Sequence, residues 1–167
     1  MNRVSPFFLV LAMLLAFQSD SRAAYSASLG KPTSSVILVV SGAIEYSNIN
    51  GEAHFDYEML EDLGFVKLVT WTPWTEGMPE FEGVSAKDLM AAVGAKGKVL
   101  HARALNDYKV DIPLSDFDKF EVIFALKQDG KRMRIREMGP IWVIYKDPYT
   151  PDISDKMIWQ LSDLQVE

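Results

Sequence analysis

Short runs of alternating hydrophobic and polar residues dominate this chain, a pattern typical of a protein built from short strands. Five of these runs predict strands, over residues 36–40, 66–70, 99–105, 122–126 and 141–145. The runs VILVV and IWVIY, at 36–40 and 141–145, are apolar throughout and predict a buried strand and a central strand. A run with imperfect alternation predicts a last strand over residues 156–166.

Short helices are predicted between the strands, because residues that start and stop helices stand at suitable spacing. Asp56 can cap the start of one helix, and Gly64 can end it in the left-handed backbone region. Ser85 and Gly94 delimit a second helix in the same way. Residues 115–119 predict a single helical turn.

Pairs of Asn, Asp and Gly predict tight turns between strands, at residues 50–51, 106–107 and 129–130. Asn106 and Asp107 are expected to form a two-residue connection into a strand that begins at Tyr108 and has one solvent-exposed face. The chain shows no internal repeat, low-complexity tract or second domain. We therefore predict one α+β domain over residues 36–167, rich in β-structure, with a mixed sheet and short helices.

The first residues have the pattern of a secretory signal peptide. Arg3 supplies positive charge, residues 7–17 (FFLVLAMLLAF) are apolar, and residues 21–24 (SRAA) offer small side chains for cleavage. The apolar run spans about 16 Å as a helix, too short for a bilayer core of about 30 Å. We expect export to the periplasm with removal of residues 1–23, no membrane insertion of the mature chain, and a flexible lead-in over residues 24–35. An uncleaved anchor is the alternative.

Charge and cysteine content narrow the possible functions. The chain has 17 Lys and Arg against 23 Asp and Glu, a net charge of −6, and loss of residues 1–23 would change it to −7. This acidic excess argues against a nucleic-acid partner. The chain has no cysteine, which excludes thiolate nucleophiles, iron–sulfur clusters and metal sites held by sulfur. With only two histidines as well, we expect no metal site.

The segment TWTPWTEG, residues 70–77, raises a question about its aromatic side chains. It holds two of the four tryptophans, next to a proline and three threonine hydroxyls. These rings can form a stacking surface for a flat ligand or a loop folded back on the core. Trp142 and Trp159 lie within predicted strands and are expected in the core, whereas Trp74 is compatible with either role.

The segment KRMRIR, residues 131–136, places four cations within six residues of an acidic protein. In a strand, Arg132, Arg134 and Arg136 would share one face. Such a strand can simply be a solvated sheet edge that resists pairing with other chains. Alternatively, a guanidinium group can bind a carbonyl, a phosphate or a partner's carboxylate. The following Gly139-Pro140 pair is expected to shape a turn.

From residue 81 onward, the order of four segments resembles the molybdopterin-binding domain of the sulfite oxidase family. The segments are FEGVSAKDLMAAVGA, ALNDYKVDIPLSDF, QDGKRMRIREMGPIWVIYKDP and SDKMIWQLSDLQV. In the family they correspond to a helix start, a strand followed by L-P-L, a hairpin before a G-P turn, and a closing strand. The resemblance implies this family's fold and a pterin-shaped pocket.

One departure from the family concerns its chemistry. Family enzymes bind molybdenum through a cysteine on the loop that precedes the first of these segments. Here that loop is residues 70–77, which offers the hydroxyls of Thr70, Thr72 and Thr75. A hydroxyl is a hard, weak donor and cannot replace a soft thiolate on a redox-active metal. The resemblance therefore implies the pocket without oxo-transfer catalysis.

A small subgroup is more closely similar to this chain. Exported single-domain proteins without the cysteine share T-P-W-T-E-G, A-L-N-D-Y and R-x-x-G-P-x-W-V-I-Y with it. Some of them are understood as periplasmic pterin-binding proteins that report ligand occupancy to a membrane sensor, which makes or degrades cyclic di-GMP. The resemblance implies a pterin as bound ligand, in place of a molybdenum cofactor, and the periplasmic domain of a membrane receptor as partner.

A pterin is a flat, polar bicycle, so its recognition needs an aromatic face and a carboxylate or amide for its edge. The residues that the sequence and the resemblance suggest for this task are Thr72, Trp74, Asn106, Asp107, Tyr108, Arg136 and Gly139. Turn chemistry alone also explains Asn106 and Asp107. The leading hypothesis is a non-catalytic pterin-binding protein. The alternatives are a molybdopterin-dependent oxidoreductase or its subunit, and a ligand-free interaction module.

Overall fold

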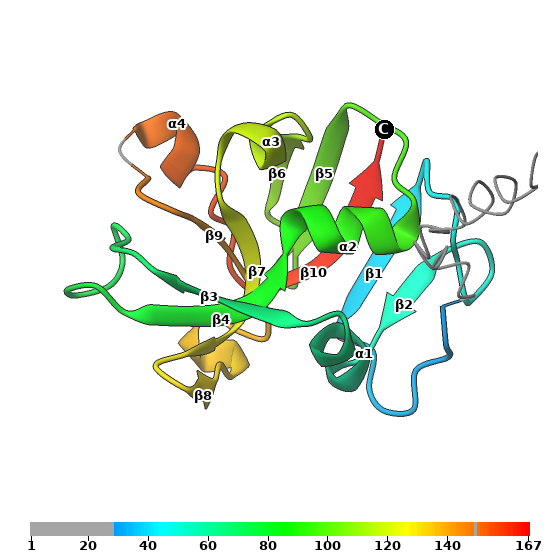
Figure 1. Cartoon of the computed structure of the whole chain (residues 1–167), viewed down its shortest axis with the longest axis horizontal. Helices are drawn as coiled ribbons and strands as arrows, with labels where there is room; N and C mark the ends of the chain where they lie inside the picture. Colours follow the sequence, from blue (N-terminus) through cyan, green and yellow to red (C-terminus); the bar gives the residue numbers. More distant parts are fainter. Residues whose placement is uncertain (1–28, 149) are drawn as a thin grey trace, which may run out of the picture.

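Two five-stranded sheets form the framework of the chain in the computed structural model, which describes residues 29–148 and 150–167 (Figure 1). The strand order of the first sheet is β2 (Ala53–Phe55), β1 (Leu38–Gly42), β10 (Leu161–Val166), β5 (Val99–Ala104) and β6 (Lys109–Pro113). The order of the second is β3 (Phe65–Val69), β4 (Glu80–Ser85), β7 (Val122–Gln128) and β8 (Lys131–Arg132), and β9 (Trp142–Tyr145) also pairs with β7.

The pairing makes the first sheet mixed. Strands β1 and β10 run parallel, while β10 and β5 run antiparallel. The last strand in sequence therefore occupies the middle of the sheet, between β1 and β5. The five strands predicted from continuous runs are confirmed, with shifts of one or two residues at their ends. The predicted last strand over residues 156–166 is shorter, because β10 begins only at Leu161.

Among the described residues, four short α-helices connect the strands: α1 (Tyr57–Asp62), α2 (Ala86–Val93), α3 (Asp116–Lys119) and α4 (Pro151–Ser154). Helix α2 packs against β4 and β7 of the second sheet. It ends at Gly94 in the left-handed region, as predicted. Ser85 lies at its N-cap, but its side chain makes no capping hydrogen bond. The fold is thus a sheet-rich α+β domain with short helices, which confirms the predicted class.

Both sheets contribute fully buried side chains to one core. The first sheet supplies Leu38, Val40, Leu100 and Leu164, and the second supplies Phe81, Phe124, Trp142 and Tyr145. The Trp142 ring meets the Phe81 ring edge-on, with 5.5 Å between their centres. Its indole N–H donates to the Met157 carbonyl oxygen at 2.9 Å. The prediction that Trp142 belongs to the core is confirmed.

Helix α4 lies between the apolar run at 141–145 and the predicted last strand, where the sequence predicted neither helix nor strand. Its four residues are too few for a periodic apolar pattern, and tertiary contacts fix the region instead. The buried Asp116 carboxylate accepts hydrogen bonds from the Tyr145 hydroxyl at 3.2 Å and the Lys156 ammonium at 3.0 Å. Burial, with the nearby Asp116 charge, raises the pKa of Tyr145, so the hydroxyl keeps its proton and remains a donor.

The predicted signal peptide, residues 1–23, and residues 24–28 of the predicted lead-in lie outside the described residues. Within the described ranges, we find no helix with the length and apolar character needed to cross a bilayer. Residues 29–35 form neither helix nor strand.

Asp56 joins this N-terminal segment to the start of α1. One carboxylate oxygen accepts the backbone N–H of Met59 at 2.9 Å and caps the helix, as predicted. The other accepts the N–H groups of Thr33 at 2.7 Å and Ser34 at 2.9 Å. Burial alone would raise the pKa of this carboxyl, but the N–H donors outweigh it and hold the pKa below its ordinary value.

Replacing Asp56 with alanine is expected to lower the free energy of unfolding by about 2–3 kcal/mol, because a cap and two further buried bonds are lost. A carboxyl with a lowered folded pKa stabilises the protein above its unfolded pKa and stops doing so as the pH falls through the folded value. Urea unfolding at pH 7 and at pH 3 measures both effects. Asp62→Ala, at the exposed end of the same helix, serves as control. An equal loss for both variants would contradict the assignment.

Candidate functional site

The loop between β3 and β4 is held in shape by its own threonines. The hydroxyls of Thr72 and Thr75 lie 2.9 Å apart, and the Thr72 oxygen also accepts the backbone N–H of Trp74 at 3.2 Å. Thr72 is 3% exposed, so its hydroxyl is enclosed within the loop. This arrangement gives Thr72 a role in fixing the position of Trp74.

The surroundings of Trp74 are compatible with both roles that the sequence left open. Its ring meets the Trp159 ring edge-on at 5.1 Å and lies 6.1 Å from the Trp142 ring at a tilt of 60°. The side chain nevertheless keeps 39% of its surface exposed. Trp74 is therefore braced by two other rings while part of its own ring remains open to a ligand. Trp159 is half-buried and precedes β10, so its predicted place within a strand is wrong.

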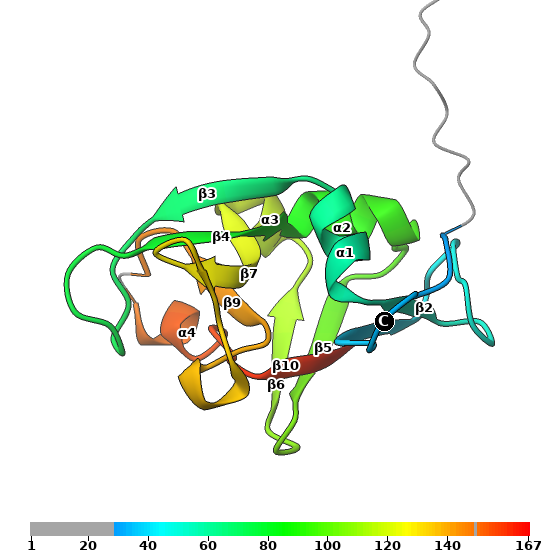
Figure 2. The ribbon, with the colours of Figure 1, turned by 90° about the horizontal axis from the view of Figure 1, so that it is seen from below.

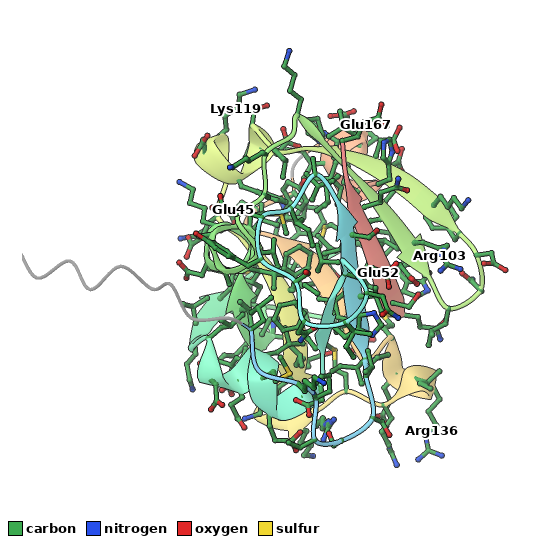
Figure 3. The ribbon with its side chains drawn as sticks, turned by 90° about the vertical axis from the view of Figure 1, so that its right-hand side faces the viewer. Glu45, Glu52, Arg103, Lys119, Arg136 and Glu167 are labelled. Atoms are coloured by element: carbon green, nitrogen blue, oxygen red, sulfur yellow. The ribbon has the colours of Figure 1, made fainter. Side chains whose placement is uncertain are left out.

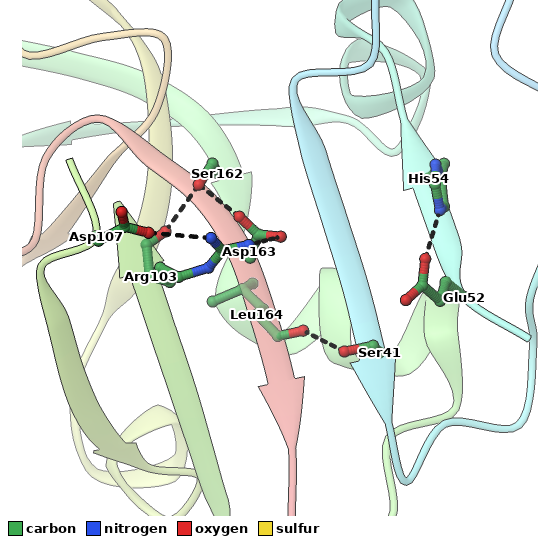
Figure 4. A network of polar contacts seen from close by, with 8 residues as sticks. All are labelled: Ser41, Glu52, His54, Arg103, Asp107, Ser162, Asp163 and Leu164. Atoms are coloured by element: carbon green, nitrogen blue, oxygen red, sulfur yellow. Dashed lines mark hydrogen bonds and ion pairs between the residues drawn. The ribbon is translucent and has the colours of Figure 1, made fainter. Parts of the chain in front are cut away.

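The β5–β6 hairpin carries three of the predicted site residues at its tip. Its connection is three residues long, not two, because Ala104 pairs with Tyr108 and Asp107 takes a left-handed conformation (φ 65°). The Asn106 side chain accepts the Tyr108 N–H at 3.1 Å. The Asp107 carboxylate contacts Arg103 at 3.2 Å (Figure 4). All three predicted side chains are exposed.

The basic segment after β7 does not form the predicted strand with three arginines on one face. Strand β8 ends at Arg132, and residues Ile135–Glu137 form a 3₁₀ turn. Arg134 folds back to donate to Glu137, and this contact lowers the pKa of the Glu137 carboxyl to about 2. The Arg132 guanidinium lies over the Tyr57 ring, 3.6 Å from its centre. These local partners explain why the arginines diverge.

Arg136 differs from the other two arginines. Its side chain extends into solvent (Figure 3), and within the described residues it has no hydrogen bond or ion pair. Gly139 stands three residues further on, where an added Cβ would lie 2.3 Å from the Met133 carbonyl oxygen. Gly139 thus allows two backbone segments to approach closely, in agreement with the predicted role of this turn. A direct contact of either residue with a ligand stays a prediction.

Gln160 joins the separate pieces of the site, and sequence reasoning missed it. Its backbone carbonyl accepts the Leu105 N–H at 2.9 Å, and its backbone N–H donates to the Met138 carbonyl at 3.0 Å. Its side-chain amide donates to the Ile135 carbonyl at 2.9 Å. The neighbouring Trp159 contacts Trp74. Gln160 therefore connects the hairpin tip with the 3₁₀ turn, beside the tryptophan cluster.

Two adjacent surface hollows lie between these segments. The larger one, about 700 Å³, is open and lined by Arg132, Met133, Arg134, Ile135, Arg136 and Pro140. The smaller one, about 280 Å³, shares Ile135 and Pro140 with it and adds Leu105 of the hairpin. In Figure 2 the hairpin tip and the turn after β8 project from the same side of the molecule. The structure thus brings Asn106–Tyr108 and Arg136–Gly139 to one side of the molecule. Thr72 and Trp74 lie in a different loop, and Trp74 is connected to this side by its contact with Trp159, the neighbour of Gln160.

A comparison with protein families matches residues 48–158 to the oxidoreductase molybdopterin binding domain. The chain belongs to this family. The chain is similar in structure to the sulfane dehydrogenase SoxCD from Paracoccus pantotrophus, with a TM-score of 0.62 and 18% sequence identity. The match covers 84% of this chain and 40% of that chain, and at this identity it supports the fold alone. Among curated proteins, none matches the chain.

The donor atoms of this molybdopterin-binding domain do not fit a molybdenum ion. The sequence has no cysteine, and the described residues contain no group of three His, Asp or Glu side chains that converge on one point. His54 lies 2.8 Å from Glu52, and His101 is held between Asp111 and Glu167 on the exposed surface. The Thr72 hydroxyl is engaged within its loop. The sequence therefore offers no cysteine thiolate for the metal that the family name implies.

Proposed function

We propose that this chain is a non-catalytic pterin-binding protein that acts in the periplasm and relays ligand occupancy to a membrane-bound receptor. The receptor would synthesise or degrade cyclic di-GMP. The observation that carries the proposal is a molybdopterin-binding domain without a cysteine thiolate for molybdenum. The resemblance to small exported proteins that share the TPWTEG and ALNDY segments supports the export and signalling parts.

The residues proposed for the ligand lie in two places, Trp74 beside Trp159 and the hairpin tip beside the 3₁₀ turn, and Trp159 and Gln160 connect the two. A pterin ring stacks on the exposed part of Trp74, which two other tryptophans brace and Thr72 positions. The ligand's polar edge exchanges hydrogen bonds with the exposed groups of Asn106 and Tyr108 and donates to the exposed carboxylate of Asp107. Arg136, which makes no hydrogen bond or ion pair among the described residues, binds a carbonyl or an anionic substituent. Gly139 shapes the turn beside it through its close approach to Met133.

The decisive experiment is mass spectrometry and metal analysis of protein purified from cells that export it. We expect about one pterin per chain and no stoichiometric molybdenum. Stoichiometric molybdenum would instead favour the oxidoreductase hypothesis. Protein that carries neither metal nor heterocycle, and binds no added pterin in calorimetry, would favour the ligand-free interaction module. Each outcome selects one of the three hypotheses.

A further inference from the structure

Three exposed apolar side chains meet on the side of the molecule that carries the hairpin tip. Val36 precedes β1, Leu105 lies in the hairpin, and Ile135 starts the 3₁₀ turn, so they come from distant parts of the sequence. Their exposed fractions are 41%, 51% and 59%. All three line the smaller hollow, together with Pro140 and Asp163. We call Val36, Leu105 and Ile135 the apolar patch. Clustered exposure of this kind marks an interaction surface.

The apolar patch is held in place before any partner arrives. The Leu105 backbone N–H donates to the Gln160 carbonyl, and the Gln160 side chain donates to the Ile135 carbonyl, both at 2.9 Å. The two segments that carry the most exposed side chains are therefore fixed to one residue. A surface that is ordered in advance loses little conformational entropy on binding, which favours association.

The charges around the apolar patch are unequally paired. Arg103 contacts Asp163 at 2.8 Å and Asp107 at 3.2 Å, so both nearby carboxylates already have a cation (Figure 4). Glu137 is paired with Arg134. Arg136 stands next to Ile135 and makes no hydrogen bond or ion pair among the described residues, although its charge contributes to the lowered pKa of Glu137. Glu137 is shared by two arginines, so the excess charge beside the apolar patch is positive, although the chain as a whole carries −6.

We infer that the apolar patch docks a segment of a partner protein that carries apolar side chains and a carboxylate. The apolar side chains fill the smaller hollow, and the carboxylate pairs with Arg136. A protein segment fits this hollow better than a lipid bilayer does, because individual side chains can insert into a concave surface. In addition, an anionic membrane repels a chain with a net negative charge. Where the partner is the receptor, the inference rests on the proposed function: Leu105 adjoins Asn106 and Ile135 adjoins Arg136, so a docked segment touches the ligand-binding residues.

Photocrosslinking in cells that produce the full chain tests this inference. Benzoylphenylalanine replaces Ile135 or Leu105, and replaces Val69 on the edge strand β3 as a control, since Val69 is also 49% exposed. We expect both patch positions to crosslink to one segment of one partner protein, which peptide mass spectrometry shows to contain apolar residues and Asp or Glu. The control position should not yield this adduct.

Charge reversal supplies the second readout. Arg136→Glu should lower the yield of the Ile135 adduct by up to about fivefold, the upper end of the range for loss of an exposed ion pair. Lys119→Glu makes the same change at the opposite end of the molecule (Figure 3) and should leave the yield unchanged. Adducts only with lipid, only with a second copy of this chain, or with basic segments would overturn the inference, as would equal effects of both variants.

The same samples separate this inference from the proposed function. Pterin content is measured on each purified variant, and Ile135→Glu keeps all seven predicted pterin contacts. We expect this variant to lose the partner adduct at position 105 while it retains the pterin. If the wild-type chain is purified without pterin but still forms the partner adduct at position 105, this result would contradict only the proposed ligand.

Discussion

Replacing Trp74 with alanine is expected to weaken pterin binding by about 1–3 kcal/mol, roughly a 5- to 150-fold rise in Kd, the range observed when an aromatic ring that stacks on a nucleobase is removed. The exposed part of the Trp74 ring supplies the stacking surface, and Trp142 and Trp159 brace it from behind. Isothermal titration calorimetry with a reduced and an oxidised pterin measures the change.

Two further variants make the Trp74 result interpretable. Trp74→Phe keeps an aromatic face and should retain most of the affinity. Met78→Ala removes a 56% exposed side chain from the same loop and should leave the Kd unchanged. Circular dichroism must show that the alanine variant is folded, because Trp74 also packs on two buried or half-buried rings. Unchanged affinity in a folded Trp74→Ala protein would refute the stacking role.

The largest effect on stability is expected at Gly83, in the buried strand β4. An added Cβ would lie 2.0 Å from the Phe124 carbonyl oxygen and 2.6 Å from the Ala125 Cα. These are backbone atoms of the neighbouring strand β7, which also pairs with β8 and β9 and cannot shift alone. Gly83→Ala should therefore lower the free energy of unfolding by about 3–5 kcal/mol.

Gly30→Ala is the matched control for this prediction, because an added Cβ at Gly30 meets nothing within 4 Å. It should change the stability by less than about 0.5 kcal/mol. Chemical unfolding followed by tryptophan fluorescence measures both variants, since Trp142 reports on the core. A Gly83→Ala protein with wild-type stability would show that β4 and β7 can separate at this point without cost.

Much of the fold could be predicted because local signals agree with the tertiary structure. The apolar run at 141–145 becomes β9, whose four residues are all buried, and Asp56 caps α1 as its side chain suggests. The failures occur where local signals are weak or where distant contacts prevail. Helix α4 is too short to show a periodic apolar pattern in the sequence. Strand β10 starts late because residues 157–160 make only isolated backbone hydrogen bonds and do not form a ladder with another strand.

The candidate site was less predictable, because its assembly depends on contacts between distant segments. The sequence pointed to Trp74 and to the hairpin tip, but nothing in it indicated that Gln160 would hold Leu105 and Ile135 together. The basic run looked like a strand because its residues alternate. Contacts of Arg132 with Tyr57 and of Arg134 with Glu137 ended that strand early.

The position of β10 has a consequence for how this chain is made. Strands β1 and β5 cannot join into one sheet until β10 inserts between them, and β10 is the last strand to be synthesised. We therefore expect the first sheet to close only after residues 161–166 have been synthesised.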